Sequence, residues 1–158
     1  MATDISKMTL PELFKMIAEI PAAKRSEHLR EIANLKPDIK TVLLYTYHSD
    51  YVFELPEGAP PYKNVDMPDN WGYNRLPKEL RKFKYFFKGN QLHAIKREKI
   101  FIEVLESLSP DEAKLVLMMK DKKLTYKGKQ ADRYAITKKI VMEALPELFV
   151  GEKEVENV

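Results

Sequence analysis

The stretch that decides the fold is residues 109–149, which read SPDEAKLVLMMKDKKLTYKGKQADRYAITKKIVMEALPELF. Apolar residues at helical spacing predict two amphipathic helices around a loop rich in Lys and Arg. The first begins at Ser109-Pro110-Asp111-Glu112, which supplies an N-cap, a first-turn proline and a glutamate three residues on, and it runs to about Lys122. The second runs from about Thr137 to Leu145, where Pro146 stops or kinks it. No acid–base or metal-ligand pattern lies nearby, which favours a binding surface over an active site.

Five further helices are predicted upstream, from apolar periodicity and from Pro or Gly at their ends. The first has the clearest start, because Thr9 and Glu12 fit a capping box. We expect an all-α fold, a single compact domain of about seven helices over residues 1–150, with an acidic flexible tail at 151–158. The upstream helices are predicted at 10–20, from Pro21 to about 34, from Pro37 to about Tyr47, at 78–88, and at 92–108 with Ile95, Phe101, Val104, Leu105 and Leu108 as its apolar face.

Residues 55–77 interrupt the helical pattern and hold half of the 10 prolines. Proline removes a backbone donor and biases the preceding residue towards extended conformations, so a long ordered loop is predicted. Tyr62, Met67, Trp71 and Tyr73 are too apolar for a loose linker, and we expect the loop to pack across the helices. A polyproline recognition motif is disfavoured because its Pro-Pro pair is too short. Just before the loop, Tyr51-Val-Phe-Glu-Leu resembles a short strand, for which the sequence offers no convincing partner.

Composition narrows the function classes. The 158 residues are 44% hydrophobic and contain no cysteine, which excludes disulfides, thiolate metal sites and a cysteine nucleophile. No apolar run approaches the roughly 20 residues that span a bilayer, and the N-terminus lacks a signal-peptide core, so a cytoplasmic protein with no membrane association is expected. His28, His48 and His93 lack metal-ligand spacing, and no Gly-rich phosphate loop follows a strand. We expect no enzymatic activity, no metal and no cofactor.

The net charge of +3 is mild, but its distribution is uneven. Of the 27 Lys and Arg residues, 17 lie in residues 78–99 and 114–139, which hold four acidic residues in all. A basic region of this kind indicates a polyanion partner, because phosphate contacts supply most non-specific affinity for nucleic acid. The plainer interpretation is a solvated, lysine-rich surface. The candidate phosphate contacts in the first stretch are Arg81, Lys84 and Lys88, with Tyr85 beside them. Those in the second are Lys122, Lys123, Lys127, Lys129, Arg133 and Lys138, where free N–H groups at the start of the last helix would add to them.

Three segments carry a resemblance to small proteins of unknown function from T-even-like phages, cyanophages in particular. The segments are 56–62, 96–106 and 111–124. The likeness extends over nearly the whole chain, and it implies a bacteriophage protein that acts in the host cytoplasm.

The order of helices also resembles, more distantly, the N-terminal DNA-binding domain of phage-type ATP-dependent DNA ligases. The corresponding segments are 14–20, 24–35, 43–47, 116–124 and 136–148. In ligases this domain holds duplex DNA through its backbone on the minor-groove side. The resemblance therefore implies contacts from Lys120 and Lys139, besides Lys122, Lys123, Lys127 and Lys138. Two features depart from ligases: residues 125–135 form a longer loop, and no Lys-x-Asp-Gly adenylation motif is present.

The sequence thus predicts a non-enzymatic phage accessory protein that binds duplex DNA through phosphates, without base specificity. The alternative is a protein–protein adaptor for a host or phage replication or transcription protein. The apolar, proline-rich segment 55–73 and the acidic tail motivate that alternative.

Overall fold

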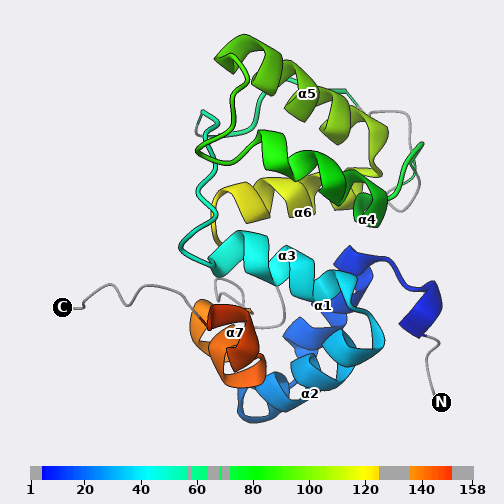
Figure 1. Cartoon of the computed structure of the whole chain (residues 1–158). Coiled ribbons are helices and arrows are strands. Elements are labelled where there is room, and N and C mark those ends of the chain that lie inside the picture. The colour runs from blue at the N-terminus through cyan, green and yellow to red at the C-terminus, as the bar shows by residue number, and fades with distance from the viewer. Residues whose placement is uncertain (1–4, 57, 64–67, 69–71, 125–135, 151–158) are drawn as a thin grey trace.

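Seven α-helices and three 3₁₀ helices form the part of the chain that the computed structural model describes, which is residues 5–56, 58–63, 68, 72–124 and 136–150 (Figure 1). The predicted all-α fold is confirmed, and the two helices of the 109–149 stretch are both present. In chain order the elements are η1 (Ile5–Lys7), α1 (Leu10–Glu19), α2 (Ala22–Leu35), α3 (Asp38–Tyr47), α4 (Leu76–Glu79), η2 (Leu80–Tyr85), α5 (Ala94–Ser107), α6 (Pro110–Lys120), α7 (Lys138–Ala144) and η3 (Pro146–Phe149).

Local signals position the helix ends. The capping box at α1 is present: Thr9 Oγ1 accepts from the Glu12 amide at 3.3 Å, and Glu12 Oε1 accepts from the Thr9 amide at 2.8 Å. At α6 the Ser109 hydroxyl accepts from the Glu112 amide at 3.2 Å. These bonds satisfy amides that a helix start otherwise leaves without partners, which explains why the predicted starts of α1 and α6 agree with the structure.

The helix α3 lies at the centre of the molecule. Figure 1 shows α4, α5 and α6 on one side of it and α2 and α7 on the other. It packs against α6, α2 and η3, and one continuous core of buried side chains runs through both sides. Its fully buried residues include Ile39, Val42 and Leu43. The helix α3 therefore contacts both halves of the molecule. Residues 48–55, which follow its C-terminal end, lead from α3 towards the half that contains α4, α5 and α6 (Figure 1).

Two predictions about local structure are wrong. The α-helix predicted at 78–88 is instead a short α4 followed by the 3₁₀ helix η2. The buried residues Leu80, Phe83 and Phe86 recur every three positions, which matches the three residues per turn of a 3₁₀ helix. Ile95, predicted on the apolar face of α5, is 84% exposed, because α5 begins only at Ala94 and its first turn lies outside the core.

The segment predicted as a strand without a partner does have one. Phe53 forms an antiparallel bridge with Phe87, which follows η2. The Glu54 amide donates to the Phe86 carbonyl, and the Lys88 amide donates to the Val52 carbonyl, both at 2.7 Å. Local sequence patterns could not reveal this pairing, because Phe87 lies more than thirty residues from Phe53, in a segment predicted as an α-helix.

The proline-rich loop packs across the helices, as predicted, in the parts that the structure describes. The Lys63 amide donates to Glu106 of α5 at 3.0 Å, and the Asn74 amide donates to the Ser107 carbonyl at 2.9 Å. Tyr62 packs against the core, whereas Tyr73 is 74% exposed. Met67 and Trp71 lie outside the described residues. Within the described ranges, no helix is both long enough and apolar enough to cross a membrane.

Candidate functional site

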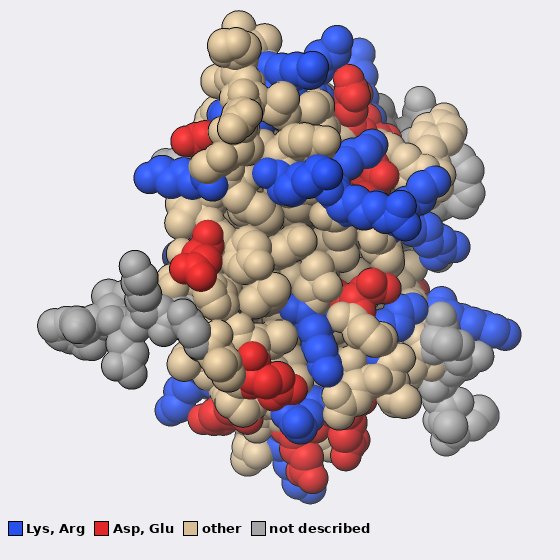
Figure 2. All heavy atoms as spheres, viewed as in Figure 1, with Lys and Arg blue, Asp and Glu red and all other residues tan. Residues whose placement is uncertain are grey.

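Six basic side chains are exposed along residues 75–88, and we call this surface the basic ridge. Figure 2 shows Lys and Arg gathered over α4 and η2. Only one acidic residue, Glu79, belongs to the same stretch, and it is 3% exposed. The ridge therefore presents a row of cations to solvent with no exposed carboxylate of its own. Its members are Arg75, Lys78, Arg81, Lys82, Lys84 and Lys88.

The 3₁₀ geometry of η2 creates this arrangement. With three residues per turn, Arg81 and Lys84 fall on one outward face while Phe83 stays in the core. The rise of about 2 Å per residue separates those two positions by roughly 6 Å along the axis. The Lys84 ammonium lies over the ring of Tyr85, 5.2 Å from its centroid. A ridge of point charges of this kind suits a backbone of phosphates better than base edges.

Glu79 has its partners inside the protein. Its carboxylate lies 3.1 Å from the Lys82 ammonium and accepts from the Ser107 hydroxyl at 3.3 Å. The buried carboxylate thus connects η2 to α5 and offsets the charge of Lys82, one of the ridge lysines. The other five cations keep the ridge strongly positive.

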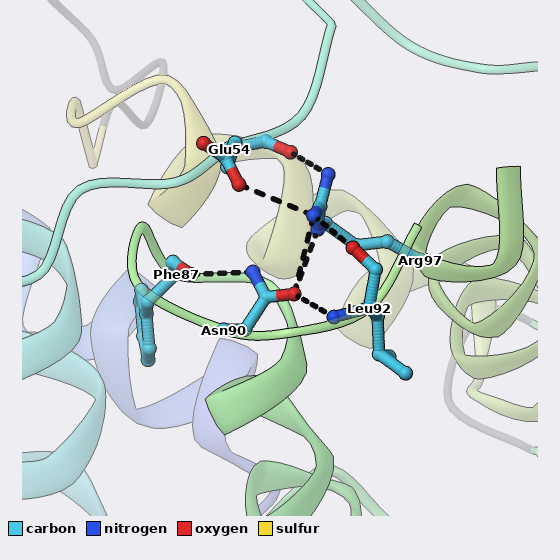
Figure 3. A network of polar contacts seen from close by, with 5 residues as sticks. All are labelled: Glu54, Phe87, Asn90, Leu92 and Arg97. Carbon is cyan, nitrogen blue, oxygen red and sulfur yellow. Dashed lines mark hydrogen bonds and ion pairs between the residues drawn. The ribbon is translucent and has the colours of Figure 1, made fainter. Parts of the chain in front are cut away.

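A network of polar contacts around the buried Arg97 fixes the end of the ridge (Figure 3). Arg97 is 7% exposed, and its guanidinium donates to the Leu92 carbonyl at 2.6 Å and to Asn90 Oδ1 at 3.1 Å. The same side chain pairs with Glu54 at 3.2 Å. Asn90 in turn donates to the Phe87 carbonyl at 2.6 Å. These bonds hold the turn that carries Lys88 against the segment that follows α3.

The second basic region begins where α6 ends. The Lys123 amide donates to the Met118 carbonyl at 3.1 Å, and the Lys122 amide donates to the Met119 carbonyl at 3.0 Å. This pair of bonds is a Schellman motif, whose C′ residue takes the left-handed conformation that glycine normally supplies. Here the residue is Lys122, with φ of 65°. A long cationic side chain therefore occupies the left-handed position at which Schellman turns usually have a glycine.

The Lys122 side chain extends to the end of α3. Its ammonium donates to the Tyr45 carbonyl at 3.1 Å and also to the Tyr51 carbonyl, and it lies 5.2 Å from the ring centroid of Phe53. Burial, and secondarily the charge of Lys138, lower the pKa of Lys122 to about 8. The Lys122 side chain thus connects the turn after α6 to the end of α3 and the residues that follow it.

Lys120 has a structural role. Its side chain is 4% exposed, and its ammonium donates to the Pro56 carbonyl and pairs with Asp121, both at 3.1 Å. A phosphate contact would require breaking these bonds, so we leave Lys120 out of the candidate interface. Its aliphatic stem and two fixed bonds secure the start of the proline-rich loop to α6.

The remaining candidates of this region differ in exposure. Lys123 and Lys139 are exposed, while Lys138 is half-buried with its ammonium 5.7 Å from the ring centroid of Phe149. At the start of α7 the Thr137 hydroxyl accepts from the Ile140 amide at 3.3 Å, so a side chain already satisfies one of the N–H groups there. Lys127, Lys129 and Arg133 lie outside the described residues.

The two ends of the 125–135 segment are held together. Leu124 and Ile136 form an antiparallel bridge, with the Ile136 amide donating to the Leu124 carbonyl at 3.4 Å. The Tyr47 hydroxyl donates to the Ile136 carbonyl and accepts from the Leu124 amide at 3.2 Å. Burial raises the pKa of Tyr47, which keeps this hydroxyl protonated as a donor.

The basic ridge and the second basic region meet at residues 51–53. The Lys88 amide donates to the Val52 carbonyl, and the Lys122 ammonium binds the carbonyl of the preceding Tyr51. Beside this junction lies an open pocket of about 350 Å³, lined by residues 46–49, 51 and 52 and by Lys122 and Lys138. A lysine from each sequence stretch thus bonds to this segment, Lys88 through its backbone amide and Lys122 through its ammonium.

The sequence predicted Arg81, Lys84 and Lys88 as phosphate contacts, and all three belong to the basic ridge, but it missed Arg75, Lys78 and Lys82. The signal that could have found them is the spacing of three among Leu80, Phe83 and Phe86, which favours a 3₁₀ helix over an α-helix. Among the described residues, no group of three or more His, Asp or Glu is placed to hold a metal ion.

Comparison with known proteins identifies a family whose function is unknown. The sequence model of a family of unknown function (DUF6433) matches residues 18–126. Neither the curated proteins nor the solved structures contain a match. The matched range includes the whole basic ridge, α6 and Lys122, and it stops before α7.

Proposed function

The chain belongs to the DUF6433 family, of unknown function, and we propose that this member is a non-enzymatic protein that binds duplex DNA through backbone phosphates without base specificity. The observation that carries the proposal is the basic ridge: residues 75–88 expose six cations, and their one carboxylate is buried. Each phosphate neutralised by Lys or Arg releases condensed counterions, which favours binding at low salt.

Several features support phosphate contact over base recognition. Four of the six ridge cations are lysines, which act as point charges and do not read base edges in the bidentate way of arginine. They belong to α4, η2 and the residues that flank them, and both elements are fixed to the core by buried Leu76, Leu80 and Phe83. The resemblance to phage ligase domains, which hold the DNA backbone, favours the same mode.

The other candidate contacts extend the ridge. Lys123 and Lys139 are exposed, and the two basic regions adjoin at residues 51–53. We propose that the DNA lies chiefly along the basic ridge, with Lys123, Lys138 and Lys139 as additional contacts. The resemblance to small T-even-like phage proteins supports an accessory role during infection, in the host cytoplasm.

The test is a salt titration of binding with matched charge variants. Duplex DNA of mixed sequence should bind the wild-type protein at low salt, with log K falling linearly against log salt. In the double variant Arg81→Glu/Lys84→Glu, the slope should decrease by about two and the affinity should drop roughly tenfold or more. The matched control, Lys7→Glu/Lys24→Glu, changes the net charge equally on the exposed η1–α2 side.

The outcome that contradicts the proposal is equally direct. If the wild-type protein fails to bind duplex DNA at micromolar concentration and low salt, the function is wrong and the protein–protein adaptor becomes the better hypothesis. If both double variants lose the same affinity, net charge and not the ridge controls binding.

A further inference from the structure

The pocket beside residues 51–53 has a half-buried lysine in its wall. It lies between the C-terminal end of α3, the turn after α6 and the start of α7, and its volume of about 350 Å³ is within the range of small-ligand sites. Lys122 lines it together with the aromatic residues Tyr47, His48 and Tyr51. A small ring compound in this open pocket would therefore lie beside the Lys122 side chain.

Two hydrogen bonds orient the nitrogen of the Lys122 side chain. It donates to the Tyr45 carbonyl at 3.1 Å and also to the Tyr51 carbonyl. A neutral amine has two hydrogens and one lone pair, so both bonds can persist when the nitrogen loses its third proton. The two bonds and the left-handed turn hold the side chain, with the lone pair directed away from both carbonyls. A nucleophile is thus fixed before any ligand binds, which lowers the entropic cost of its reaction.

Lys122 also loses its proton more easily than an ordinary lysine. Burial, and secondarily the charge of Lys138, lower its pKa to about 8. The other titratable groups around the pocket, within the described chain, are Tyr45, Tyr47, His48, Asp50, Tyr51 and Lys138. About one Lys122 in ten is therefore neutral at pH 7, against fewer than about one in a thousand for an unperturbed lysine. Only the neutral amine attacks a carbonyl carbon, and desolvation in a pocket is one way in which proteins activate a lysine for this reaction.

We propose that Lys122 forms a reversible imine with an aldehyde that occupies this pocket. The lone pair of the neutral nitrogen bonds to the carbonyl carbon, and the carbonyl oxygen takes up protons and leaves as water. The product is a protonated imine, which keeps one N–H for the Tyr45 and Tyr51 carbonyls. No oxidant or reductant takes part, and hydrolysis regenerates the lysine.

Two sources offer the aldehyde that this chemistry requires. One is a small free aldehyde, and the other is the ring-opened sugar of an abasic site in DNA. The second source rests on the proposed DNA binding along the basic ridge, whereas the first does not. In both cases the adduct is a covalent form of binding and requires no catalytic turnover.

The test traps the imine by reduction. The full chain is incubated with benzaldehyde and sodium cyanoborohydride, which reduces the imine to a stable amine, and mass spectrometry of tryptic peptides gives the rate at each lysine. At pH 7, Lys122 should be labelled about tenfold faster than the exposed Lys123 and Lys139. This ratio should fall as the pH rises beyond about 8, because Lys122 is then already neutral.

Matched variants decide whether the pocket is responsible. Lys122→Arg keeps a positive charge and N–H donors but forms no imine, so the fast labelling should disappear. Ser49→Trp fills the pocket from its wall and should slow the labelling of Lys122 towards that of Lys123. Gln91→Trp adds the same side chain at an exposed residue outside the pocket and should leave the rate at Lys122 unchanged.

A DNA duplex distinguishes the two sources of the aldehyde. A duplex with one abasic site is trapped under the same reducing conditions, beside a control duplex whose abasic sugar has been reduced to the alcohol. A covalent complex through Lys122 with the first duplex alone supports the abasic site, and fast benzaldehyde labelling without that complex supports a free aldehyde. The ridge variant Arg81→Glu/Lys84→Glu should lose the complex and keep the benzaldehyde labelling, so failure of DNA binding and failure of this site are separable.

Two results would overturn the proposal. Equal labelling rates at Lys122, Lys123 and Lys139 at pH 7 would leave Lys122 as a purely structural contact. Fast labelling of Lys122 that persists in a folded Ser49→Trp variant would show that the pocket does not hold the aldehyde.

Discussion

At the scale of single residues, Lys122 combines an unfavourable backbone with a useful side chain. A left-handed conformation costs a residue with a Cβ roughly 1–2 kcal/mol, and glycine avoids that cost. In return, the lysine at φ of 65° spans from the end of α6 to two carbonyls near the end of α3. The strained backbone at Lys122 therefore accompanies hydrogen bonds to the Tyr45 and Tyr51 carbonyls, which a glycine could not form.

This strain can be isolated by comparing two variants that both remove the side-chain contact. Lys122→Gly should be more stable than Lys122→Ala by about 1 kcal/mol, because only the glycine relieves the left-handed backbone. Urea denaturation measures both free energies of unfolding. At Lys123, the order should reverse, since Lys122 is the one residue with a side chain at positive φ in the described chain. Equal stability of the two Lys122 variants would show that the turn carries no strain.

The lowered pKa of Lys122 predicts a specific pH dependence. The unfolded chain retains the lysine proton up to about pH 10.5, whereas the folded protein releases it at about 8. Between these values the unfolded state binds more protons, so the free energy of unfolding should rise with pH relative to that of Lys122→Ala. Parallel urea curves at pH 7, 8.5 and 10 measure the difference. A difference that stays constant or falls with pH contradicts the lowered pKa.

At the scale of elements, the sequence predicts where helices start better than which kind of helix follows. Thr9 and Ser109 correctly predict the starts of α1 and α6, because an N-cap depends on a hydrogen bond between residues close in sequence. The 3₁₀ character of η2 and the bridge between Phe53 and Phe87 depend on packing with distant residues, which local patterns do not contain. For the same reason the sequence predicted the exposed face of Arg81 and Lys84 from local spacing, but it could not show that Lys120 is buried.

The packing of the proline-rich loop on the α5–α6 junction rests on one small residue. A Cβ added at Gly72 would lie 2.3 Å from the Ser109 nitrogen and 2.6 Å from the Leu108 carbonyl carbon, which are backbone atoms that cannot step aside cheaply. Gly72→Ala should therefore destabilise the protein by about 1–3 kcal/mol. Gly58→Ala is the contrasting variant, because nothing lies near its Cβ and its cost would come only from φ of 81°. Thermal unfolding of both compares steric with conformational cost.

At the scale of the whole molecule, both ends of the chain contribute to one core. Before the family-matched range 18–126, α1 buries Leu13, Phe14 and Ile17 completely. After that range, α7 packs against α2, and the Arg30 guanidinium donates to the Ala144 carbonyl at 2.7 Å. The matched range is thus a part of the fold that needs its flanking helices.

A chain shortened to residues 18–126 should consequently fail to fold. Removing the first part of α1 deletes three fully buried apolar side chains and exposes the core surface that they cover. Each such side chain is worth about 1.5–3 kcal/mol when buried, against a total stability of roughly 5–15 kcal/mol. The measurement is circular dichroism with a urea titration, and the comparison is residues 5–150. Cooperative unfolding of the shorter chain would show that the matched range is an independent domain.

The bridge between Leu124 and Ile136 has a consequence for how this protein can vary. The bridge and the Tyr47 hydroxyl hold Leu124 and Ile136 together through bonds in which no residue of 125–135 takes part. Doubling the length of a flexible closed segment costs only about 0.6 kcal/mol. We therefore expect a reporter peptide inserted within 125–135 to leave the bond between Leu124 and Ile136 in place and to cost little stability.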